Sequence, residues 1–336
     1  MIHTLLFDLD GTLIDSNADI AQSVNHVRGQ YGLPPLSLTE VTAAIGDGLH
    51  KLLERTVPQA DARAADLYRA HHAEHLLDHT VLYSGVRAGL EQLQQARVAL
   101  AVVSNKPTAF CERVLEGLGV RTFFAAVVGG DSAAGRKPDP GPVRQALDLV
   151  GRTSWDALMV GDSPGDIAAG RAANVGTVAA LWGFRSAEQL AASQPDTTAR
   201  SFAEVVAMVP MDGGRVRSVF EALGRDRLFA LARAFYQRVP DEPRLSGMFP
   251  FDLREPIERQ ALFLIQFFGG PPDYAIRRGA PRLRMRHGPF RIGPEQAQAW
   301  LDLMLSAMQE IGIEEPAAGV MRRYFAHTAA FLINTR

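Results

Sequence analysis

Thr4-Leu5-Leu6-Phe7-Asp8-Leu9-Asp10-Gly11-Thr12 is the stretch of this sequence that decides the fold. A short apolar run leads into two carboxylates and a glycine, which is the pattern of a buried strand that ends in a turn. In an open parallel sheet, ligands bind just beyond the carboxyl ends of the strands. The stretch therefore predicts a strand over residues 4–9, with Asp8 and Asp10 placed where chemistry is expected.

The same kind of apolar run recurs further along the chain. Short β-branched or apolar segments bounded by turn residues lie at Val98 to Ser104, Ala125 to Val128, Ala157 to Val160 and Thr177 to Leu181. Helical patterns separate most of them, as at Lys137 to Val150 and Asp166 to Ala173. Strands that alternate with helices predict an α/β fold, a doubly wound parallel sheet with helices on both faces.

One connection is too long for a simple crossover between strands. Residues 15–79 are almost wholly helical in pattern. We therefore expect an inserted helical cap over residues 16–79, lying above the strand ends of a core that residues 1–15 and 80–210 form.

A second domain is expected after residue 210. The segment Pro210-Met211-Asp212-Gly213-Gly214 is rich in Pro and Gly, as hinges between domains are. Residues 1–210 have a net charge of −6 from 17 basic and 23 acidic residues, whereas residues 211–336 have +4 from 18 and 14. No strand pattern follows residue 211, and helical periodicity covers Val216 to Leu223, Leu228 to Val239, Ile257 to Phe268, Pro294 to Ile311 and Pro316 to Ile333. We predict an all-α domain over residues 211–336.

The composition excludes several classes of protein. With 47% hydrophobic and 21% charged residues among 336, the chain is expected to be globular, and two domains suit its length. A net charge of −2 argues against a dedicated nucleic-acid binder, and no apolar run approaches the ~20 residues of a membrane helix. The N-terminus lacks the basic region of a signal peptide, and the single cysteine, Cys111, suits a reducing compartment. We expect a cytoplasmic protein.

A second acidic pair and two polar loops complete a candidate site in the first domain. Asp162 and Asp166 follow the apolar run at residues 157–160, and two acidic loops at one sheet edge would repel each other without a cation between them. Carboxylates are hard oxygen ligands of the kind that Mg²⁺ uses together with water and a substrate phosphate. Ser104-Asn105 and Lys137 lie in two further loops and offer a hydroxyl, backbone N–H groups and a cation. The pattern predicts a phosphate cradle opposite a metal.

These segments, Asp8-Leu9-Asp10-Gly11-Thr12, Ser104-Asn105, Lys137-Pro138 and Gly161-Asp162 with Asp166, resemble in order the four motifs of the haloacid dehalogenase (HAD) superfamily. The resemblance covers about residues 1–210 and implies a phosphoric monoester hydrolase. It implies that Asp8 is the nucleophile that forms an aspartyl-phosphate, and that Asp10 is first the general acid and then the base. It further implies that Thr12, Ser104, Asn105 and Lys137 hold the phosphoryl oxygens. Mg²⁺ would be bound by Asp8, the Asp10 carbonyl and Asp162, with Asp166 in support. The dehalogenase branch is disfavoured because it lacks the second aspartate that Asp10 supplies.

Two segments of the first domain indicate a substrate. Ile45-Gly46-Asp47-Gly48-Leu49 resembles the specificity loop of phosphoglycolate phosphatases, which makes Gly46, Asp47 and Gly48 candidate specificity residues. Tyr83-Ser84-Gly85-Val86 resembles the Tyr-Pro-Gly-Val segment common in that branch, with Ser84 as a departure. The resemblance implies 2-phosphoglycolate as the substrate. Relatives with this architecture act on other small phosphates, such as sugar phosphates, nucleotides or pyrophosphate, and these remain alternatives.

Histidines recur at every fourth position of the cap. His71, His75 and His79 could bind Zn²⁺ across one helix face, although such a row is more often a solvated or packing face.

The second domain has two histidines, and the surroundings of one of them indicate a haem pocket. His287 ends the run Arg282-Leu283-Arg284-Met285-Arg286-His287, and six arginines occur from residue 277 to 291. Such a run could be a patch for nucleic acid or another anion. However, an imidazole beside guanidinium groups and between apolar helices also suits a haem, in which the histidine binds iron and arginines pair with the propionates.

The wider pattern resembles a truncated haemoglobin of the second group. The segments that carry the resemblance are Ala234-Phe235-Tyr236, Met248-Phe249-Pro250, Phe267-Phe268-Gly269-Gly270-Pro271, Arg278 to His287, and Ala299-Trp300. The resemblance implies that His287 is the proximal iron ligand and that Phe249 packs on the haem. Tyr236, Gln260 and Trp300 would be distal hydrogen-bond donors to bound O₂, and Arg284 and Arg286 partners of the propionates. Pro256, near the start of the expected distal helix, makes Gln260 the less secure assignment.

Hypotheses of different classes follow for the whole chain. The first is a Mg²⁺-dependent phosphatase whose turnover the haem domain regulates in response to O₂. The second is a bifunctional chain whose globin binds O₂ or NO, or does redox chemistry, independently. The third is that the arginine-rich segment binds an anionic partner and no haem is present. Neither nucleic acid nor a membrane is an expected partner.

Overall fold

The chain divides into two compact units, which are described separately. A computed structural model describes residues 2–132, 135–209, 211–212, 215–216 and 218–335. One unit is formed mainly by residues 2–209 and the other mainly by residues 216–335. The Gly213-Gly214 part of the expected hinge and Pro210 lie outside the described residues.

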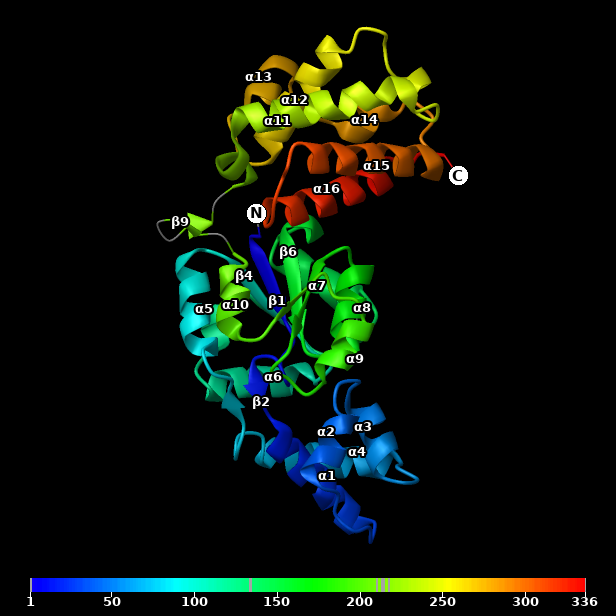
Figure 1. The fold of residues 1–336 in the computed structure, drawn as a ribbon. Coiled ribbons are helices and arrows are strands. Elements are labelled where there is room, and N and C mark those ends of the chain that lie inside the picture. The colour runs from blue at the N-terminus through cyan, green and yellow to red at the C-terminus, as the bar shows by residue number, and fades with distance from the viewer. Residues whose placement is uncertain (1, 133–134, 210, 213–214, 217, 336) are drawn as a thin grey trace. The chain divides into compact units, whose positions relative to one another are not determined.

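The first unit is built on a parallel sheet of six strands in the order β5-β4-β1-β6-β7-β8 (Figure 1). All five neighbouring pairs are parallel, and Thr4 of the central strand pairs with Ala99 on one side and Ala157 on the other. The strands are β1 (Thr4–Phe7), β4 (Ala99–Val103), β5 (Ala126–Val128), β6 (Ala157–Gly161), β7 (Gly176–Ala180) and β8 (Thr197–Ala199). The predicted α/β fold with a parallel sheet is therefore confirmed.

Side chains of β1 alternate between the two faces of the sheet, because successive residues of a strand point in opposite directions. Leu6 joins a buried cluster with Val143 and Ala146 of α7 and Ala169 of α8. Phe7 faces the other way and stacks on Phe202 of α10, with ring centroids 5.4 Å apart. One strand thus anchors helices on both faces, which holds the loop after it, Asp8 to Thr12, in a fixed place.

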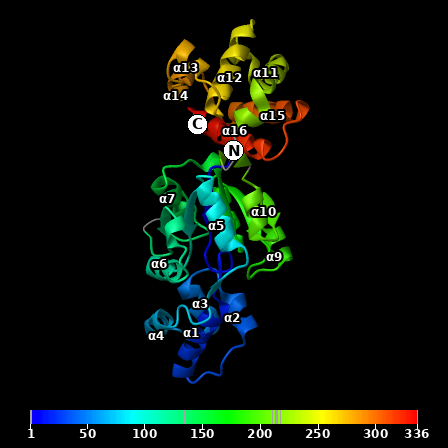
Figure 2. The same cartoon turned by 90° about the vertical axis from the view of Figure 1, so that its left-hand side faces the viewer.

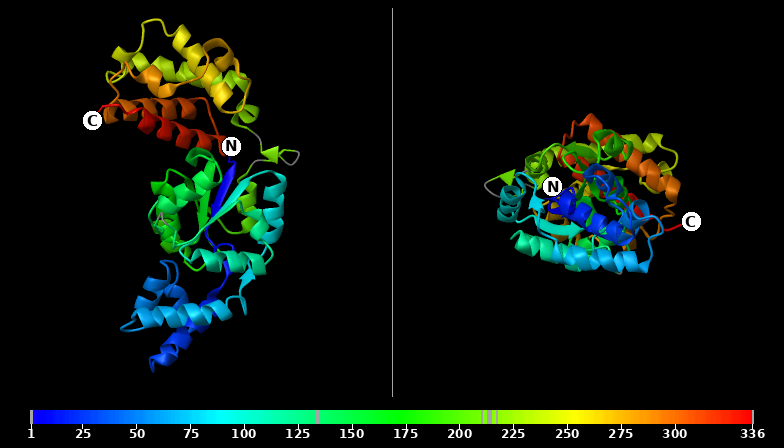
Figure 3. Two further views of the ribbon diagram at one scale, coloured as in Figure 1. Left: turned by 180° about the vertical axis from the view of Figure 1, so that it is seen from behind. Right: turned by 90° about the horizontal axis from the view of Figure 1, so that it is seen from below.

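Helices cover both faces of the sheet, with α5 and α10 on one side and α7 and α8 on the other (Figures 1 and 3). Gly89 of α5 lies so close to Phe202 of α10 that a Cβ would come within 2.5 Å of its ring. The helical elements of the core, on both faces of the sheet and in its connections, are α5 (Val86–Gln95), α6 (Thr108–Gly117), η1 (Arg121–Phe123), α7 (Gly141–Leu149), η2 (Ser154–Asp156), α8 (Pro164–Ala172), α9 (Ala187–Ala192) and α10 (Phe202–Ala207).

Four helices between β1 and α5 form a separate cluster at the end of the sheet where β1 terminates (Figure 2). They are α1 (Asn17–Gln30), α2 (Leu38–Ala44), α3 (Leu49–Thr56) and α4 (Ala62–Glu74). The chain leaves the core through β2 (Ile14–Asp15) and returns through β3 (Val81–Leu82), and these two strands pair antiparallel. Val24, Val27, Val41 and Leu53 form the buried centre of the cluster. We refer to these four helices as the cap.

The second unit consists of helices, of which α11 packs against α12 and α15, and α15 against α16. They are α11 (Val219–Arg238), η3 (Val239–Asp241), η4 (Ser246–Met248), α12 (Arg254–Phe267), α13 (Asp273–Arg278), α14 (Leu283–His287), α15 (Pro294–Glu310) and α16 (Ala317–Leu332). The two helices expected over residues 216–239 are both present as segments of α11, and they are separated by a kink at Gly224, whose φ of 75° and ψ of 172° are not helical. Edge-to-face rings of Phe235, Trp300 and Phe325 join α11, α15 and α16.

One expectation about the second part is wrong. No strand was predicted after residue 211, yet β9 (Met211–Asp212) and β10 (Arg215–Val216) pair in a two-stranded sheet. Strands of two residues are too short to show a periodic pattern in the sequence. In the described part of the chain, no helix is both long enough and apolar enough to cross a membrane.

Candidate functional site

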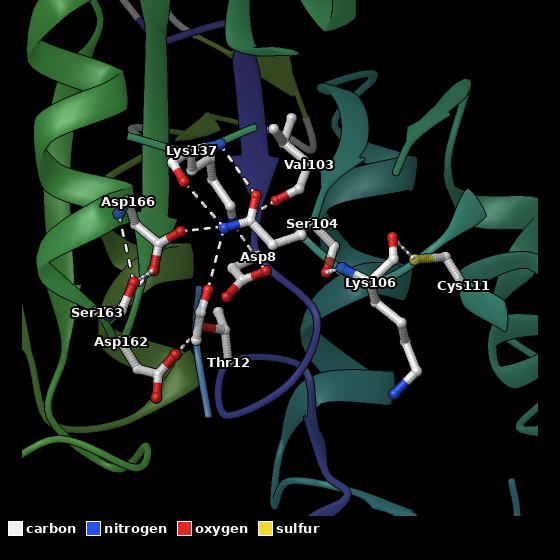
Figure 4. Close-up of polar contacts among 12 residues, drawn as sticks. Asp8, Thr12, Val103, Ser104, Lys106, Cys111, Lys137, Asp162, Ser163 and Asp166 are labelled. Atoms are coloured by element: carbon white, nitrogen blue, oxygen red, sulfur yellow. Dashed lines mark hydrogen bonds and ion pairs between the residues drawn. The ribbon is translucent and has the colours of Figure 1, made fainter. Parts of the chain in front are cut away.

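The loops that carry the predicted polar residues meet at one edge of the sheet. Asp8 directly follows β1, Ser104 follows β4 and Asp162 follows β6, and these three strands are neighbours. Lys137 comes from the loop before α7. Figure 4 shows the side chains of Asp8, Lys137 and Asp166 directed toward one another.

Lys137 is at the centre of this group and is 4% exposed. Its Nζ lies 2.7 Å from Asp8 Oδ1, 2.6 Å from Asp166 Oδ1 and 2.6 Å from the carbonyl oxygen of Val103. An ammonium group has three N–H donors, so these contacts use all of them. Because each partner belongs to a different loop or strand end, Lys137 holds the carboxylate of Asp8 in one position.

The carboxylates of Asp8, Asp162 and Asp166 are buried and offer oxygen atoms that all lie within 4.8 Å of one another. Three carboxylates and the one ammonium of Lys137 would give this group a net charge of −2. Burial, followed by the charge of Asp166, raises the pKa of Asp8 to about 7, and burial raises that of Asp162 to about 8, with Asp8 and Asp166 adding to the effect. A divalent cation that prefers oxygen ligands, such as Mg²⁺, fits these carboxylates because it would neutralise their excess negative charge.

Backbone and side-chain donors fix the two aspartates that follow β6. Asp162 accepts a hydrogen bond from the Thr12 hydroxyl at 3.3 Å and one from the Phe184 N–H at 2.7 Å. Asp166 Oδ2 accepts from the N–H and the hydroxyl of Ser163, the N-cap of α8, at 3.0 and 2.6 Å. Both carboxylates are therefore oriented before any ligand binds.

Gly11 allows the first loop to approach Asp162. Its φ is +88°, in the left-handed region that favours glycine, and a Cβ there would lie 2.3 Å from Asp162 Oδ2. A larger residue at this position would displace the carboxylate or the loop.

Asn105 ties the lysine loop to the cap. Its Oδ1 accepts from the Lys137 N–H at 2.9 Å, and its Nδ2 donates to the Lys137 carbonyl and to the Gly46 carbonyl, both at 3.0 Å. The hydroxyl oxygen of Ser104 accepts from the Lys106 N–H at 3.2 Å, so its own proton remains for another acceptor. The structure thus brings Thr12, Ser104 and Lys137 to one place and gives Asn105 backbone partners in two loops.

Asp10 has different hydrogen-bond partners from the other three carboxylates, although it lines the same pocket as Asp8. Its Oδ1 accepts from the Ser16 hydroxyl at 2.6 Å and from Lys106 Nζ at 2.9 Å. Burial raises the pKa of Asp10, but the charge and hydrogen bond of Lys106 and the hydroxyl of Ser16 outweigh burial and hold it below the ordinary value. The sequence analysis did not single out Lys106, although its position directly after Ser104-Asn105 was a usable signal.

A pocket of about 70 Å³ joins this site to the cap. Asp8, Asp10, Ser104 and Asn105 line it from the core, and Gly46 and Gly48 line it from the predicted specificity loop. Asp47 of the same loop does not line it and pairs instead with Arg55 at 2.5 Å. The remaining lining residues are Ile20, Ile45, Leu49, Leu52, Tyr68, His72, Lys106, Pro107 and Phe110.

The cap histidines form a packed face rather than a metal cluster. The rings of His26, His71 and His75 stack with centroids 4.2 and 4.3 Å apart, and His75 pairs with Asp78 at 2.7 Å. The backbone N–H of His79 donates to Asp19. Among the described residues, only the three aspartates of the core bring three candidate metal ligands together.

The second unit contains a larger cavity of about 520 Å³. Five of the predicted pocket residues line it: Tyr236 from α11, Phe249 after η4, Gln260 from α12, His287 from α14 and Trp300 from α15. Pro256 lies in the first turn of α12, where proline is tolerated, and Gln260 follows one turn later. Burial raises the pKa of the Tyr236 hydroxyl to about 12, so this group stays protonated.

Of the residues predicted to bind the haem iron and the propionates, His287 and Arg286 line this cavity. His287 Nδ1 lies 2.8 Å from the Leu283 carbonyl, a bond that fixes the ring and leaves Nε2 as the nitrogen for a ligand. Arg286 lines the cavity, but its guanidinium donates to the carbonyls of Pro281 and Arg278 at 2.9 and 2.8 Å. Arg284 does not line the cavity and lies over the Phe331 ring at 4.4 Å. Arg259 lines the cavity beside Tyr236 and was not predicted.

Comparison with known families identifies both units. Residues 5–180 match the model of the haloacid dehalogenase-like hydrolases, and residues 218–333 match that of the bacterial-like globins. The first match spans more than half of the chain.

Individual proteins resemble one unit each. The phosphoglycolate phosphatase of Chromobacterium violaceum is 36% identical over 213 residues, which are 61% of this chain and 95% of the relative. A structure described as a predicted phosphoglycolate phosphatase from Haemophilus somnus is 30% identical, covers 62% of this chain and 98% of its own, and has a TM-score of 0.59. The haemoglobin of Chloroflexus aurantiacus is 48% identical, covers 35% of this chain and 99% of its own, and has a TM-score of 0.35. The chain therefore belongs to the haloacid dehalogenase-like hydrolases, as a phosphatase homologous to phosphoglycolate phosphatases, and it also contains a bacterial-like globin domain.

Proposed function

We propose that the first unit is a Mg²⁺-dependent phosphomonoesterase that hydrolyses 2-phosphoglycolate. The observation that carries the proposal is the carboxylate of Asp8, held by Lys137 at 2.7 Å beside two further buried carboxylates and lining a small pocket. We assign residues 1–210 to this domain, with residues 16–79 as its cap, and residues 211–336 to the globin domain. The cytoplasm is the compartment that we propose, in keeping with the buried free thiol of Cys111.

In the first step, the carboxylate of Asp8 attacks the phosphorus of the substrate. The new bond between Asp8 and phosphorus forms as the bond between phosphorus and the alcohol oxygen breaks, which leaves an aspartyl-phosphate. Although Lys106 and Ser16 hold the pKa of Asp10 below its ordinary value in the free site, Asp10 must carry a proton at this step, and it donates that proton to the departing oxygen. The Ser104 hydroxyl and the Lys137 ammonium stabilise the phosphoryl oxygens, with Thr12 at the same edge.

In the second step, Asp10 acts as the base. It takes a proton from a water molecule whose oxygen attacks phosphorus, and the bond to Asp8 breaks. Inorganic phosphate leaves, Asp8 is again a carboxylate, and Asp10 is again protonated. The same residue can serve both steps because it loses a proton in the first and gains one in the second.

The residues that would hold Mg²⁺ are Asp8, Asp162, Asp166 and the backbone carbonyl of Asp10. When bound, the ion supplies positive charge against the phosphoryl oxygens and the carboxylates. The chain prepares the site for it through the donors to Asp162 and Asp166, which fix both carboxylates at a separation within 4.8 Å.

The size of the pocket and the similarity to phosphoglycolate phosphatases support 2-phosphoglycolate as the substrate. A pocket of about 70 Å³ has room for a small ester and little more. The relative from C. violaceum is a phosphoglycolate phosphatase, and 95% of its length aligns with this chain. Sugar phosphates, nucleotides and pyrophosphate are the alternatives for the test.

The test is phosphate release from 2-phosphoglycolate and a panel of those esters, with Mg²⁺ and with EDTA. We expect 2-phosphoglycolate to have the highest kcat/KM and EDTA to abolish turnover. A clear preference for another ester would overturn the substrate, and activity in EDTA would overturn the role of the metal.

We propose further that the cavity of the second unit holds a haem. A cavity of about 520 Å³ lies within the range of sites for large ligands, and His287 is positioned by its Nδ1 contact so that Nε2 would bind the iron. When bound, the haem supplies a site for a diatomic gas such as O₂. Phe249 would pack on the haem, and Tyr236, Gln260 and Trp300 would donate hydrogen bonds on the distal side. Arg286 lines the cavity, and the guanidinium N–H groups that its bonds to the Pro281 and Arg278 carbonyls leave over would pair with a propionate, whereas Arg284 does not line the cavity.

Control of the phosphatase by the haem ligand is the function that we propose for the fusion. The covalent joining of a phosphatase and a globin in one chain supports it. The measurement is kcat/KM for 2-phosphoglycolate with the haem reduced under nitrogen, then exposed to O₂, then oxidised to the ferric state. Equal values in all three states would favour the alternative, a globin that binds O₂ or NO independently of the phosphatase. Absence of a strong visible band after haem addition would favour an anion-binding arginine segment instead.

A further inference from the structure

Two basic side chains in the phosphatase pocket have no part in the mechanism above. Lys106 and His72 both line the pocket, and both are buried: the Lys106 side chain is 7% exposed and His72 is 1% exposed. The rest of the pocket wall is largely apolar, with Ile20, Leu49 and Leu52 from the cap and Phe110 from α6 among its residues. Buried polar groups against an apolar wall require a reason, because leaving them unpaired costs free energy.

His72 contributes an acceptor to this pocket and no positive charge. The Ser23 hydroxyl donates to the Asp19 carbonyl at 2.9 Å, so its oxygen accepts from His72 Nδ1 at 3.0 Å. Nδ1 then carries the ring proton, and Nε2, which has no hydrogen-bond partner among the described residues, is the acceptor. Burial, together with the charge of Lys106, lowers the pKa of His72 to about 3, in agreement with a neutral ring.

Lys106 therefore carries the one permanent positive charge among the described residues that line the pocket. Its Nζ has three donors, and Asp10 Oδ1 at 2.9 Å accepts one of them. Asp10 Oδ1 already has a second donor in the Ser16 hydroxyl at 2.6 Å. The ammonium can therefore bind another anion without leaving Asp10 Oδ1 alone.

The place of Lys106 relative to Asp10 indicates where that anion would be. In the proposed reaction, Asp10 protonates the alcohol oxygen of the substrate, so this oxygen lies next to Asp10. Lys106 is one hydrogen-bond length from Asp10, and it reaches an anionic group attached one carbon beyond the alcohol oxygen.

We propose that Lys106 selects the substrate by pairing with a carboxylate carried one carbon from the phosphate ester. This inference rests on the proposed phosphatase function and adds the residue that distinguishes phosphorylated hydroxy acids from neutral phosphate esters. A charged hydrogen bond of this kind in a desolvated pocket contributes about a hundredfold to affinity. The carboxylate also enters beside Asp10, and Lys106 offsets the repulsion between the two.

The experiment compares two matched substrates, 2-phosphoglycolate and 2-hydroxyethyl phosphate, which differ in a carboxylate against a hydroxymethyl group. The ratio of their kcat/KM values is measured for the full-length protein, Lys106→Met and Lys106→Arg. We expect the ratio to fall about a hundredfold in Lys106→Met, mainly through KM for 2-phosphoglycolate, and to recover in part in Lys106→Arg. Lys51→Met, which removes an exposed cap lysine paired with Glu54, is the matched control and should leave the ratio unchanged.

A second readout does not depend on turnover. Glycolate should inhibit hydrolysis of 2-hydroxyethyl phosphate by the wild type and lose most of this inhibition in Lys106→Met, whereas inorganic phosphate should inhibit both. An equal fall in kcat/KM for both matched esters, with glycolate inhibition retained, would show that Lys106 only positions Asp10 and would overturn the inference. Failure of the wild type to hydrolyse any ester of the panel would instead overturn the proposed function on which the inference rests.

Discussion

The side chain of Asn105 forms two hydrogen bonds with the backbone of Lys137, accepting from its N–H at 2.9 Å and donating to its carbonyl at 3.0 Å. The same amide nitrogen donates to the Gly46 carbonyl of the cap at 3.0 Å. Asn105 thus fixes the backbone from which the Lys137 side chain reaches Asp8, and it joins that backbone to the cap. Asn105 acts here as a positioning residue for Lys137.

Replacing Asn105 by Ala should lower kcat. The Lys137 N–H and carbonyl would lose buried partners, each worth about 1–3 kcal/mol when left unsatisfied, so we expect a decrease of about 10- to 100-fold. Steady-state kinetics with 2-phosphoglycolate measure it. Asn105→Asp keeps the acceptor for Lys137 N–H but loses both donated bonds, so it should lie between wild type and Asn105→Ala. Wild-type kcat in Asn105→Ala would contradict this role.

Replacing Asp8 by Asn should abolish turnover and leave the second unit intact. An amide has no carboxylate to form the acyl-phosphate, so we expect a decrease of at least about 10⁴-fold in kcat. The visible absorption band of the haem-loaded protein should be unchanged in this variant. Loss of both properties without unfolding would contradict two functionally separate sites.

Much of the fold could be predicted from the sequence because its strands are buried on both faces. Such strands are continuous apolar runs, and the runs ending at Phe7, Val103 and Val160 were found within a few residues. The edge strand β8 was missed because its residues, Thr197-Thr198-Ala199, carry no such run. An edge strand pairs with a neighbour on one side and not on the other, and it therefore needs less apolar surface.

The acidic residues of the candidate site were also visible in the sequence, because Asp8 and Asp162 directly follow strands and Asp10 and Asp166 come a few residues later. The role of Asn105 was less visible: it was predicted to hold phosphate, and its partners are backbone groups 32 and 59 residues away. Gly46, Asp47 and Gly48 were all predicted as specificity residues, and of the three Gly46 and Gly48 line the pocket whereas Asp47 does not. Which residues face a pocket depends on how the cap folds onto the core, and no local pattern encodes that.

Gly11→Ala should inactivate the phosphatase. Its Cβ would fall 2.3 Å from Asp162 Oδ2, and its φ of +88° strains any residue with a side chain. We expect a decrease of at least about 100-fold in kcat/KM and a weaker response to Mg²⁺. Gly32→Ala separates the two causes, since Gly32 also has a positive φ, +66°, but has nothing within 4 Å of the new Cβ. Equal losses in both variants would show that backbone strain alone is responsible.

His287→Ala should remove haem binding and preserve phosphate release. The variant loses the ring whose Nδ1 is held by the Leu283 carbonyl at 2.8 Å and whose Nε2 we assign to the iron. Absorption spectra after haem addition measure the loss. His327→Ala is the matched control, because His327 is exposed and its ring lies against Phe331. An unchanged spectrum in His287→Ala would contradict the assignment.

Without Mg²⁺, the phosphatase domain should become less stable as pH rises from 6.5 to 8.5. The pKa values of Asp8 and Asp162 are raised from 3.8 to about 7 and about 8, so the folded state binds more protons than the unfolded state, and stability falls as pH rises through the folded values. His72 is neutral in the folded state throughout this window, and because its ordinary pKa of 6.5 lies at the lower end of the window, its unfolded-state titration opposes the fall only slightly. Calorimetry in EDTA should show a Tm that falls by several degrees. Asp162→Asn should reduce the fall, and Mg²⁺ should reverse it, because metal ions and protons compete for the same carboxylates. A Tm that rises with pH in EDTA would show that these carboxylates do not destabilise the metal-free fold.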